Sequence, residues 1–164
     1  MSAPKWQPGT IYPKGSVVTA SILTGVSPVP VANGSFETGD STGWQLDAGA
    51  SIGTWAYTGS HAVQFTGTGG IVRATSDAQP CQPGFNLSAT CYYQQGAASA
   101  GHNVGTIFVS FHGSGGAILG GRRYGGAVTS GSGGAWNRSS VSAVAPAGTE
   151  SVRVGVEVVR DRGD

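Results

Sequence analysis

The most constraining feature of this sequence is a strict alternation near its end. Valine occupies every second position from 152 to 158, and Arg153 and Glu157 lie between these valines. Successive side chains of a β-strand point to opposite faces, so this pattern predicts a strand with one apolar and one polar face. Such a strand buries its apolar face against a second layer. On the polar face, Glu157 and Arg153 are expected to form an ion pair.

The same alternation recurs in several other segments, and no segment shows a helical period of useful length. Strands are expected at residues 44–48, 52–57, 61–66, 71–76, 85–95, 105–112, 117–119, 138–145 and 151–160. Apolar residues on one face and polar residues on the other suit two packed antiparallel sheets. The sequence therefore predicts an all-β protein, a two-sheet β-sandwich, with a dry interior.

Composition agrees with this fold class. The 164 residues include 29 glycines and 8 prolines, which are unfavourable inside helices and common in turns. Only 10% of residues are charged and the net charge is +1. Charge-driven disorder and polyanion binding are both disfavoured, so we expect no nucleic-acid partner.

The first 28 residues form a separate unit in this prediction. Five of the eight prolines lie in the first 30 residues, around one candidate strand at 16–22. Proline fixes φ and removes a backbone donor, so residues 1–28 are expected to form an extended N-terminal arm. We expect this arm to lie on other chains of an assembly, and residues 29–164 to form the sandwich.

Cysteines and targeting signals give weaker indications. Cys81 and Cys91 leave two alternatives open, a disulfide or two free thiols in and near the core. No secretory signal follows Met1, and no apolar run approaches the roughly 20 residues that span a membrane. Membrane insertion is not expected.

Several motifs of the body resemble one family. They occur in the family's order at residues 33–44 (Asn-Gly-Ser-Phe-Glu to Thr-Gly-Trp), 61–65, 82–89, and 136–154 with Pro-Ala-Gly-Thr and Val-Arg-Val. This set resembles the jelly-roll carbohydrate-binding modules of families 4, 9 and 22, and the resemblance implies a jelly-roll sandwich. These modules end with a further strand. The residues after 160 do not show the sequence expected for it, so the jelly roll is expected to lack its last strand or to take it from a neighbouring chain.

Residues 6–18 do not belong to this module. They resemble short segments of tail-associated bacteriophage proteins and, more distantly, chitin-binding segments. This resemblance implies a virion component, in the tail or on the capsid surface, with other virion subunits as partners and a homo-oligomeric state. The alternative is a carbohydrate-binding module excised from a secreted polysaccharide-degrading enzyme.

Acidic residues argue against catalysis. Glycoside hydrolysis usually needs two carboxylates roughly 5–10 Å apart. The chain has eight acids, and all except Glu157 are expected in turns or at strand ends. No nucleophile elbow and no paired histidines at metal-ligand spacing occur. We therefore expect a non-catalytic protein that binds host-surface glycans or stabilises a particle.

Sugar binding needs flat aromatic faces for C–H stacking and polar side chains for hydroxyl groups. The candidates lie on outward strand faces, beside a loop, or next to Arg122 and Arg123; they are Trp55, Tyr57, Tyr92, Gln94, Phe108, His112 and Tyr124. Ordinary packing is the alternative for each, and it is favoured for Trp44 and Trp136. Phe108 interrupts a polar face, so it needs a cover, which the arm or a partner subunit would supply.

The early turn carries a candidate metal site. In the resembling modules an acid at this place binds a structural calcium ion with backbone carbonyls and a late acid. Glu37 and Asp40 match the early part of that set. A turn-capping role for Glu37 explains the same residue equally well.

Overall fold

The computed structural model describes residues 31–66, 70–94, 103–129 and 135–160. The arm expected at residues 1–28 lies outside this part of the chain. Apart from a 3₁₀ turn at Ser114–Gly116, the regular elements within these ranges are strands. Their bounds are β1 Trp44–Leu46, β2 Ala50–Gly53, β3 Ala62–Phe65, β4 Gly70–Ser76, β5 Gln79–Pro80, β6 Asn86–Tyr93, β7 Asn103–His112, β8 Arg123–Tyr124, β9 Val128–Thr129, β10 Asn137–Val144 and β11 Ser151–Arg160.

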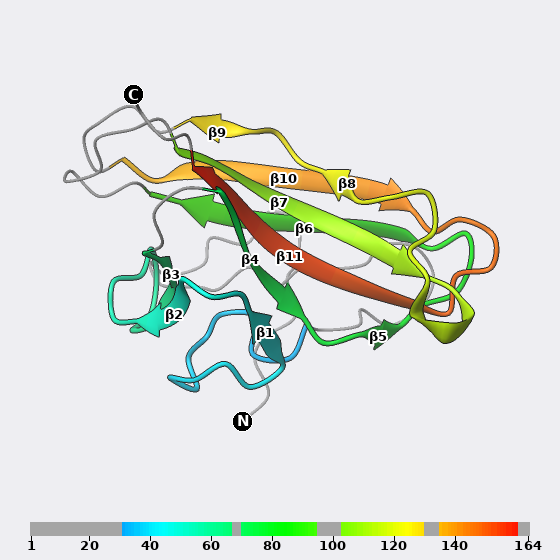
Figure 1. Ribbon diagram of the computed structural model, residues 1–164, viewed down its shortest axis with the longest axis horizontal. Coiled ribbons are helices and arrows are strands. Elements are labelled where there is room, and N and C mark those ends of the chain that lie inside the picture. Colours follow the sequence, from blue (N-terminus) through cyan, green and yellow to red (C-terminus); the bar gives the residue numbers. More distant parts are fainter. Residues whose placement is uncertain (1–30, 67–69, 95–102, 130–134, 161–164) are drawn as a thin grey trace, which may run out of the picture.

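The larger sheet is built around β11. Its strand order is β1-β4-β11-β7-β8, with β5 paired to β11 and β9 paired to β7, and every pairing is antiparallel. The alternating segment predicted from the sequence therefore lies in the middle of the sheet, hydrogen-bonded on both sides (Figure 1). Its two faces are the interior and the outer surface of the sandwich.

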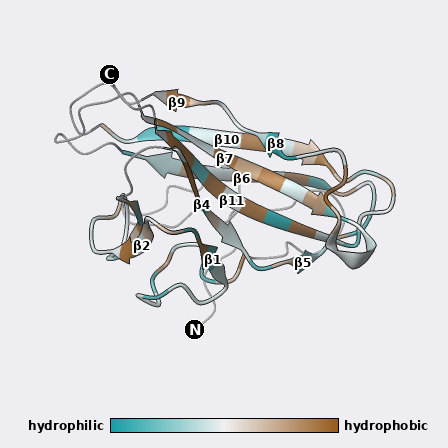
Figure 2. Ribbon diagram, viewed as in Figure 1, coloured by the Kyte–Doolittle hydropathy of each residue, from teal (hydrophilic) through white to brown (hydrophobic). Residues whose placement is uncertain are grey.

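The second layer is the antiparallel pair β6 and β10, which packs across β7 (Figure 1). A third pair, β2 and β3, flanks the sandwich. Brown and pale residues follow one another along β7 and β11 in Figure 2, as expected for strands with two different faces. The structure thus confirms the predicted all-β sandwich.

The core between the layers contains four of the five residues expected to be buried there. Leu87, Val109, Val152 and Val154 are all buried in one cluster, whereas Val156, on the same face of β11, is half-buried. Burying each large aliphatic side chain contributes about 1.5–3 kcal/mol. The face assignment read from the alternation is therefore confirmed for β6, β7 and β11.

Some short elements differ from the prediction. Residues 117–119 do not form a strand; Ile118 makes one isolated bridge to His112. Glycines at 115, 116, 120 and 121 all have positive φ, which interrupts extended pairing there. The two-residue strands β5, β8 and β9 are too short to leave an alternating pattern.

Both cysteines are free thiols. Cys81 is buried, and burial raises the pKa of the Cys91 thiol to about 12. The two-thiol alternative therefore holds in this structure. Across the described ranges, no helix has the length and apolar character needed to cross a membrane.

Candidate functional site

The structure divides the predicted sugar-binding residues between two outer faces. Tyr92 lies on the outer face of the β6–β10 sheet, and Gln94 directly follows β6. Phe108, His112 and Tyr124 belong to β7 and β8 of the larger sheet. The remaining two, Trp55 and Tyr57, lie in the loop between β2 and β3 and are 59% and 49% exposed.

Tyr57, Tyr92 and Trp136 form an aromatic cluster at one end of the β6–β10 sheet. The Tyr57 and Tyr92 rings are stacked, with centroids 4.2 Å apart and an interplanar angle of 14°. Trp136, directly before β10, lies 5.4 Å from the Tyr57 ring at 58°. Tyr57 and Tyr92 nevertheless stay 49% and 40% exposed. The cluster therefore offers flat apolar surface to solvent.

A row of small polar side chains continues from this cluster along the same face. The hydroxyl groups of Ser88 and Ser142 lie 3.3 Å apart, and those of Thr90 and Ser140 lie 3.1 Å apart. Both pairs are direct cross-strand neighbours in the β6–β10 register. Each hydroxyl can both donate and accept, as sugar hydroxyls require. We call these four residues the hydroxyl row.

Phe108 offers no surface to a ligand. Its side chain is fully buried, under the Tyr124 ring at 5.8 Å and the Arg122 guanidinium carbon at 5.1 Å from the Phe108 ring centroid. The described cover comes from residues 122–124 of the same chain, not from the arm or a partner as expected. The reason is that β8 runs antiparallel beside β7 and places Tyr124 opposite Phe108.

His112 is also engaged within the chain. Its Nε2 lies 2.9 Å from Ser110 Oγ, and its Nδ1 lies 3.0 Å from the Gly116 carbonyl oxygen. The ring is 9% exposed and holds the turn after β7. Of the three candidates on the larger sheet, only Tyr124 keeps an exposed ring.

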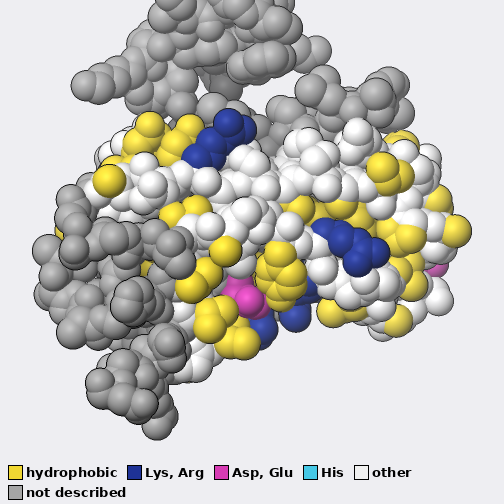
Figure 3. Space-filling model, turned by 90° about the horizontal axis from the view of Figure 1, so that it is seen from above, with side chains coloured by type: hydrophobic (Ala, Val, Ile, Leu, Met, Phe, Trp, Pro, Cys, Tyr) yellow, Lys and Arg dark blue, Asp and Glu magenta, His cyan; other side chains and the backbone are white. Residues whose placement is uncertain are grey.

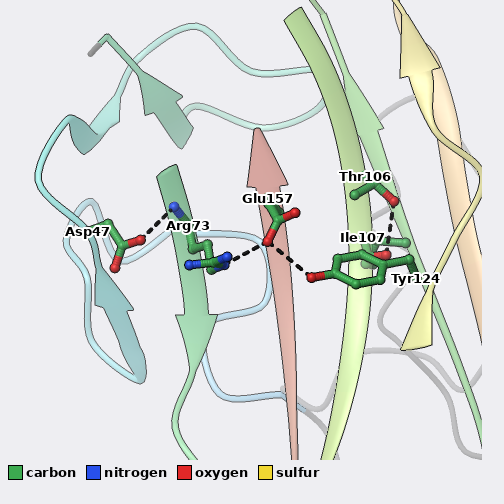
Figure 4. A network of polar contacts seen from close by, with 6 residues as sticks. All are labelled: Asp47, Arg73, Thr106, Ile107, Tyr124 and Glu157. Carbon is green, nitrogen blue, oxygen red and sulfur yellow. Dashed lines mark hydrogen bonds and ion pairs between the residues drawn. The ribbon is translucent and has the colours of Figure 1, made fainter. Parts of the chain in front are cut away.

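Glu157 is the centre of a polar network on this face (Figure 4). Arg73 Nε donates to its Oε2 at 2.7 Å, and the Tyr124 hydroxyl donates to the same oxygen at 3.2 Å. In the view of Figure 3, hydrophobic and basic side chains surround an acidic one. Glu157 is 6% exposed, so this network compensates a buried charge.

The expected Glu157–Arg153 pair is wrong. Arg73 stands directly opposite Glu157 in the β4–β11 register, whereas Arg153 is four residues away along the same strand, about 13 Å. Arg153 instead donates from Nη1 to the Ser76 carbonyl oxygen at 3.1 Å. The order of the strands, which alternation does not encode, decides the partner.

Glu37 and Asp40 are both hydrogen-bonded, Glu37 to the loop between β2 and β3 and Asp40 within its own turn. The backbone N–H groups of Ser60 and His61 donate to the Glu37 carboxylate at 2.9–3.1 Å, and these bonds, Ser60 first, lower the pKa of Glu37. The Thr38 hydroxyl at 2.7 Å, followed by the Thr42 N–H, lowers the pKa of Asp40. Glu37 thus caps backbone N–H groups, as the capping alternative expected, but those of residues 60 and 61 and not those of its own turn.

Calcium binding at these acids stays a prediction. Calcium takes six to eight oxygen ligands, and the N–H donors already present the positive ends of their dipoles to Glu37. An ion there would have to displace these donors. Among the residues that the structure describes, no group of three or more His, Cys, Asp or Glu side chains converges.

As pH rises from about 3 to about 6, ionisation of Glu37 should raise the free energy of unfolding of the wild type. The Glu37→Gln protein should gain less stability over the same pH range. The folded pKa of Glu37 lies below the ordinary 4.5, so its contribution is present above that value and lost as pH falls through the folded pKa. Thermal melts in EGTA should therefore separate the two proteins most at the higher pH and least at the lower. The Glu150→Gln protein serves as the control and should follow wild type.

The same melts test the ion. If added calcium raises the melting temperature of wild type but not of Glu37→Gln, the calcium prediction is supported. Equal shifts in both proteins, or none, would argue against an ion at Glu37. A wild-type melt with the same pH dependence as Glu37→Gln would contradict the capping role.

Comparison with known proteins identifies similar folds. No family model and no curated protein matches the sequence. Among solved structures, the enzymatically active domain of tailspike protein 4 of bacteriophage CBA120 matches with a TM-score of 0.57 and 15% identity. The match covers 80% of this chain and 19% of the tailspike chain, so this chain spans about a fifth of that protein.

A second similar structure is a binding module. The CBM22-1 xylan-binding domain of Paenibacillus barcinonensis Xyn10C matches with a TM-score of 0.54 and 16% identity. Here the match covers 76% of this chain and 86% of that domain. At these identities the likeness establishes the fold alone. The chain therefore has a β-sandwich of the kind found in a xylan-binding module and in a phage tailspike.

Proposed function

We propose that this protein is a non-catalytic structural component of a bacteriophage particle, in the tail or on the capsid surface, that attaches to host-surface glycans. The observation that supports glycan binding is the exposed aromatic cluster beside the hydroxyl row. Stacked rings supply apolar surface for a sugar face, and the adjacent hydroxyls supply hydrogen bonds. Xylan binding by a module of similar fold supports the same reading.

The positions of the acids support a binding rather than a catalytic role. Glu157 is buried and committed to Arg73 and Tyr124. Glu37 is committed to the backbone N–H groups of Ser60 and His61, and Asp40 to the Thr38 hydroxyl and the Thr42 N–H of its own turn. The described outward positions of β6 and β10 carry no carboxylate beside the aromatic cluster. Two carboxylates flanking a bound sugar are what hydrolysis would need.

The tailspike similarity supports the phage context, and the module-sized match to the xylan-binding domain favours the alternative, a module excised from a secreted enzyme. Oligomeric state separates the two. A virion component should form a defined homo-oligomer and incorporate into particles, and deletion of residues 2–27 should abolish incorporation while the sandwich stays folded. A soluble monomer retarded by polysaccharide gels would favour the excised module.

Removing the stacked tyrosines should weaken glycan binding strongly. The Tyr57→Ala/Tyr92→Ala protein loses the exposed ring surface, and we expect at least a tenfold loss of affinity, because an aromatic contact contributes about 0.5–1.5 kcal/mol beyond its buried area. Affinity electrophoresis against a polysaccharide panel, followed by calorimetry on any binder, measures this change.

Tyr124→Ala is the matched control, because Tyr124 is an exposed aromatic on the opposite outer face. Its affinity for the same polysaccharide should equal that of wild type. If Tyr124→Ala loses binding and the double variant retains it, the site lies on the larger sheet. If neither change affects any binding, the aromatic cluster is not a glycan site.

A further inference from the structure

Arg138 lies between the aromatic cluster and the hydroxyl row. In the β6–β10 register it stands directly opposite Tyr92, and it follows Trp136 by two positions. Directly opposed residues on one face of an antiparallel pair have Cβ atoms about 4.5–5.5 Å apart. Its Nη2 donates to Thr90 Oγ1 at 3.4 Å, a long hydrogen bond. The guanidinium is therefore on the same surface as the rings and the hydroxyls.

Arg138 carries the charge on the described outer face of β6 and β10. The other outward positions of β6 and β10 within the described ranges are occupied by neutral residues, namely Asn86, Ser88, Thr90, Tyr92, Ser140, Ser142 and Val144. Arg138 is exposed, and the ion pair found among the described residues joins Arg73 to Glu157 instead. Arg73 thus neutralises a carboxylate of its own chain, whereas the described residues on the outer face of β6 and β10 place no carboxylate beside Arg138.

We propose that this surface selects a sugar that carries a carboxylate, a uronic acid unit of an acidic polysaccharide. The inference rests on the proposed glycan-binding function and names its ligand class. The planar guanidinium matches a carboxylate with two parallel N–H···O bonds, which gives direction as well as attraction. The sugar ring lies against the tyrosines, its carboxylate on Arg138, and the following units over the hydroxyl row.

The geometry favours a carboxylate over neutral sugars for a further reason. A neutral sugar hydroxyl can pair with either a hydrogen-bond acceptor or a donor. An arginine side chain supplies only donors, which suit a carboxylate, a group that only accepts. A positive charge with no acid among the described outward residues of β6 and β10 also attracts anionic chains before contact. A sulfated chain would be attracted by the charge but lacks the planar two-oxygen match, so the test includes one.

The experiment compares uronate polysaccharides with their own methyl esters. Polygalacturonate, alginate and hyaluronan are each used as the acid and as the ester, which removes the charge and keeps the sugar chain. Wild type should bind at least one acid form roughly tenfold or more tightly than its ester. Arg138→Gln should lose this preference for the acid form. Arg138→Lys should keep part of it, because lysine carries the positive charge but lacks the two parallel N–H donors of the planar guanidinium.

Arg123→Gln is the matched control for net charge. Arg123 is exposed on β8 of the larger sheet and its Nη1 donates to the Gly120 carbonyl oxygen, so its loss changes the protein charge equally without removing a side chain of β6 or β10. It should retain the preference for the acid form. Equal losses in Arg138→Gln and Arg123→Gln, or dextran sulfate binding as tight as any uronate, would overturn the inference as general polyanion attraction.

The two proposals fail in different ways. If Tyr57→Ala/Tyr92→Ala loses binding while acids and esters bind equally and Arg138→Gln matches wild type, the surface binds glycans but does not select carboxylates. If the tyrosine variant keeps every interaction, the glycan-binding function itself fails. Circular dichroism melts of all variants ensure that losses reflect binding and not unfolding.

Discussion

Val154→Asp is expected to destabilise the sandwich strongly. Val154 is 8% exposed, lies in the central strand β11, and belongs to the core cluster with Val109 and Leu87. A carboxylate there would lose its hydration without gaining a partner, at a cost of several kcal/mol. A domain of this size is stable by only about 5–15 kcal/mol, so the change removes a large part of the free energy of unfolding and the melting temperature should fall far below that of wild type. Thermal melts and size-exclusion chromatography measure the effect.

Val159→Asp is the control on the same strand. Val159 is 37% exposed and lies on the opposite face of β11, where its Cα partner in β4 is the exposed Ile71. The new charge stays hydrated there, so the melting temperature should change little. If Val154→Asp melted as wild type does, or if the two variants were equally destabilised, the assignment of the two faces would be contradicted.

The alternation in β11 was enough to predict that Val152 and Val154 face the core, because which face a side chain takes depends on the strand alone. It did not predict how deeply each residue is buried: Val156 on the same face is half-buried, and Glu157 on the other face is buried. The partner of Glu157 depended on which strand lies beside β11, a contact between residues 73 and 157 that no local pattern encodes. The same limit applies to Phe108. Its isolated position on a polar strand face indicated that it needs a cover, but its cover comes from a two-residue strand after a glycine-rich turn.

The residues of the candidate site were likewise predictable only in part from the sequence. Tyr92 was predictable as an outward side chain from the alternation in β6. Its contact with Tyr57 was not, because a loop between two other strands brings that ring over it. Trp136 was expected to pack in the core or at an edge, and it lies against Tyr57. Arg138 was missed; the available signal was its outward position on a strand otherwise lined by serines.

Gly155 carried a signal that the alternation hides. A glycine inside a valine-rich strand marks a close approach of another group. In the structure a Cβ at Gly155 would lie within 2.3 Å of the Phe108 ring. The ring of Phe108 lies over β11 at this point because the two residues are directly opposed in the β7–β11 register. Tyr124 and Arg122 lie against the same ring.

Gly155→Ala should therefore destabilise the protein by about 1–3 kcal/mol or more, as overpacking does in well-packed sites. The Phe108 ring is fully buried and cannot swing into solvent without displacing Tyr124 and Arg122. Phe108→Leu removes the ring atoms that meet the new methyl group, at its own cost. Chemical denaturation of the wild type, the two single variants and the double variant completes a double-mutant cycle.

The expected result is a clear positive coupling: the double variant is less destabilised than the sum of the single changes, by more than about 0.5 kcal/mol. Gly126→Ala provides a baseline for replacing a glycine, because its added Cβ would meet no atom within 4 Å. If Gly155→Ala cost no more than Gly126→Ala, or if the two changes at 108 and 155 simply added, the ring would not be packed against Gly155. Non-additive effects would also indicate that the position of Tyr124, which packs on Phe108 and donates to Glu157, depends on Gly155, the single glycine of the central strand.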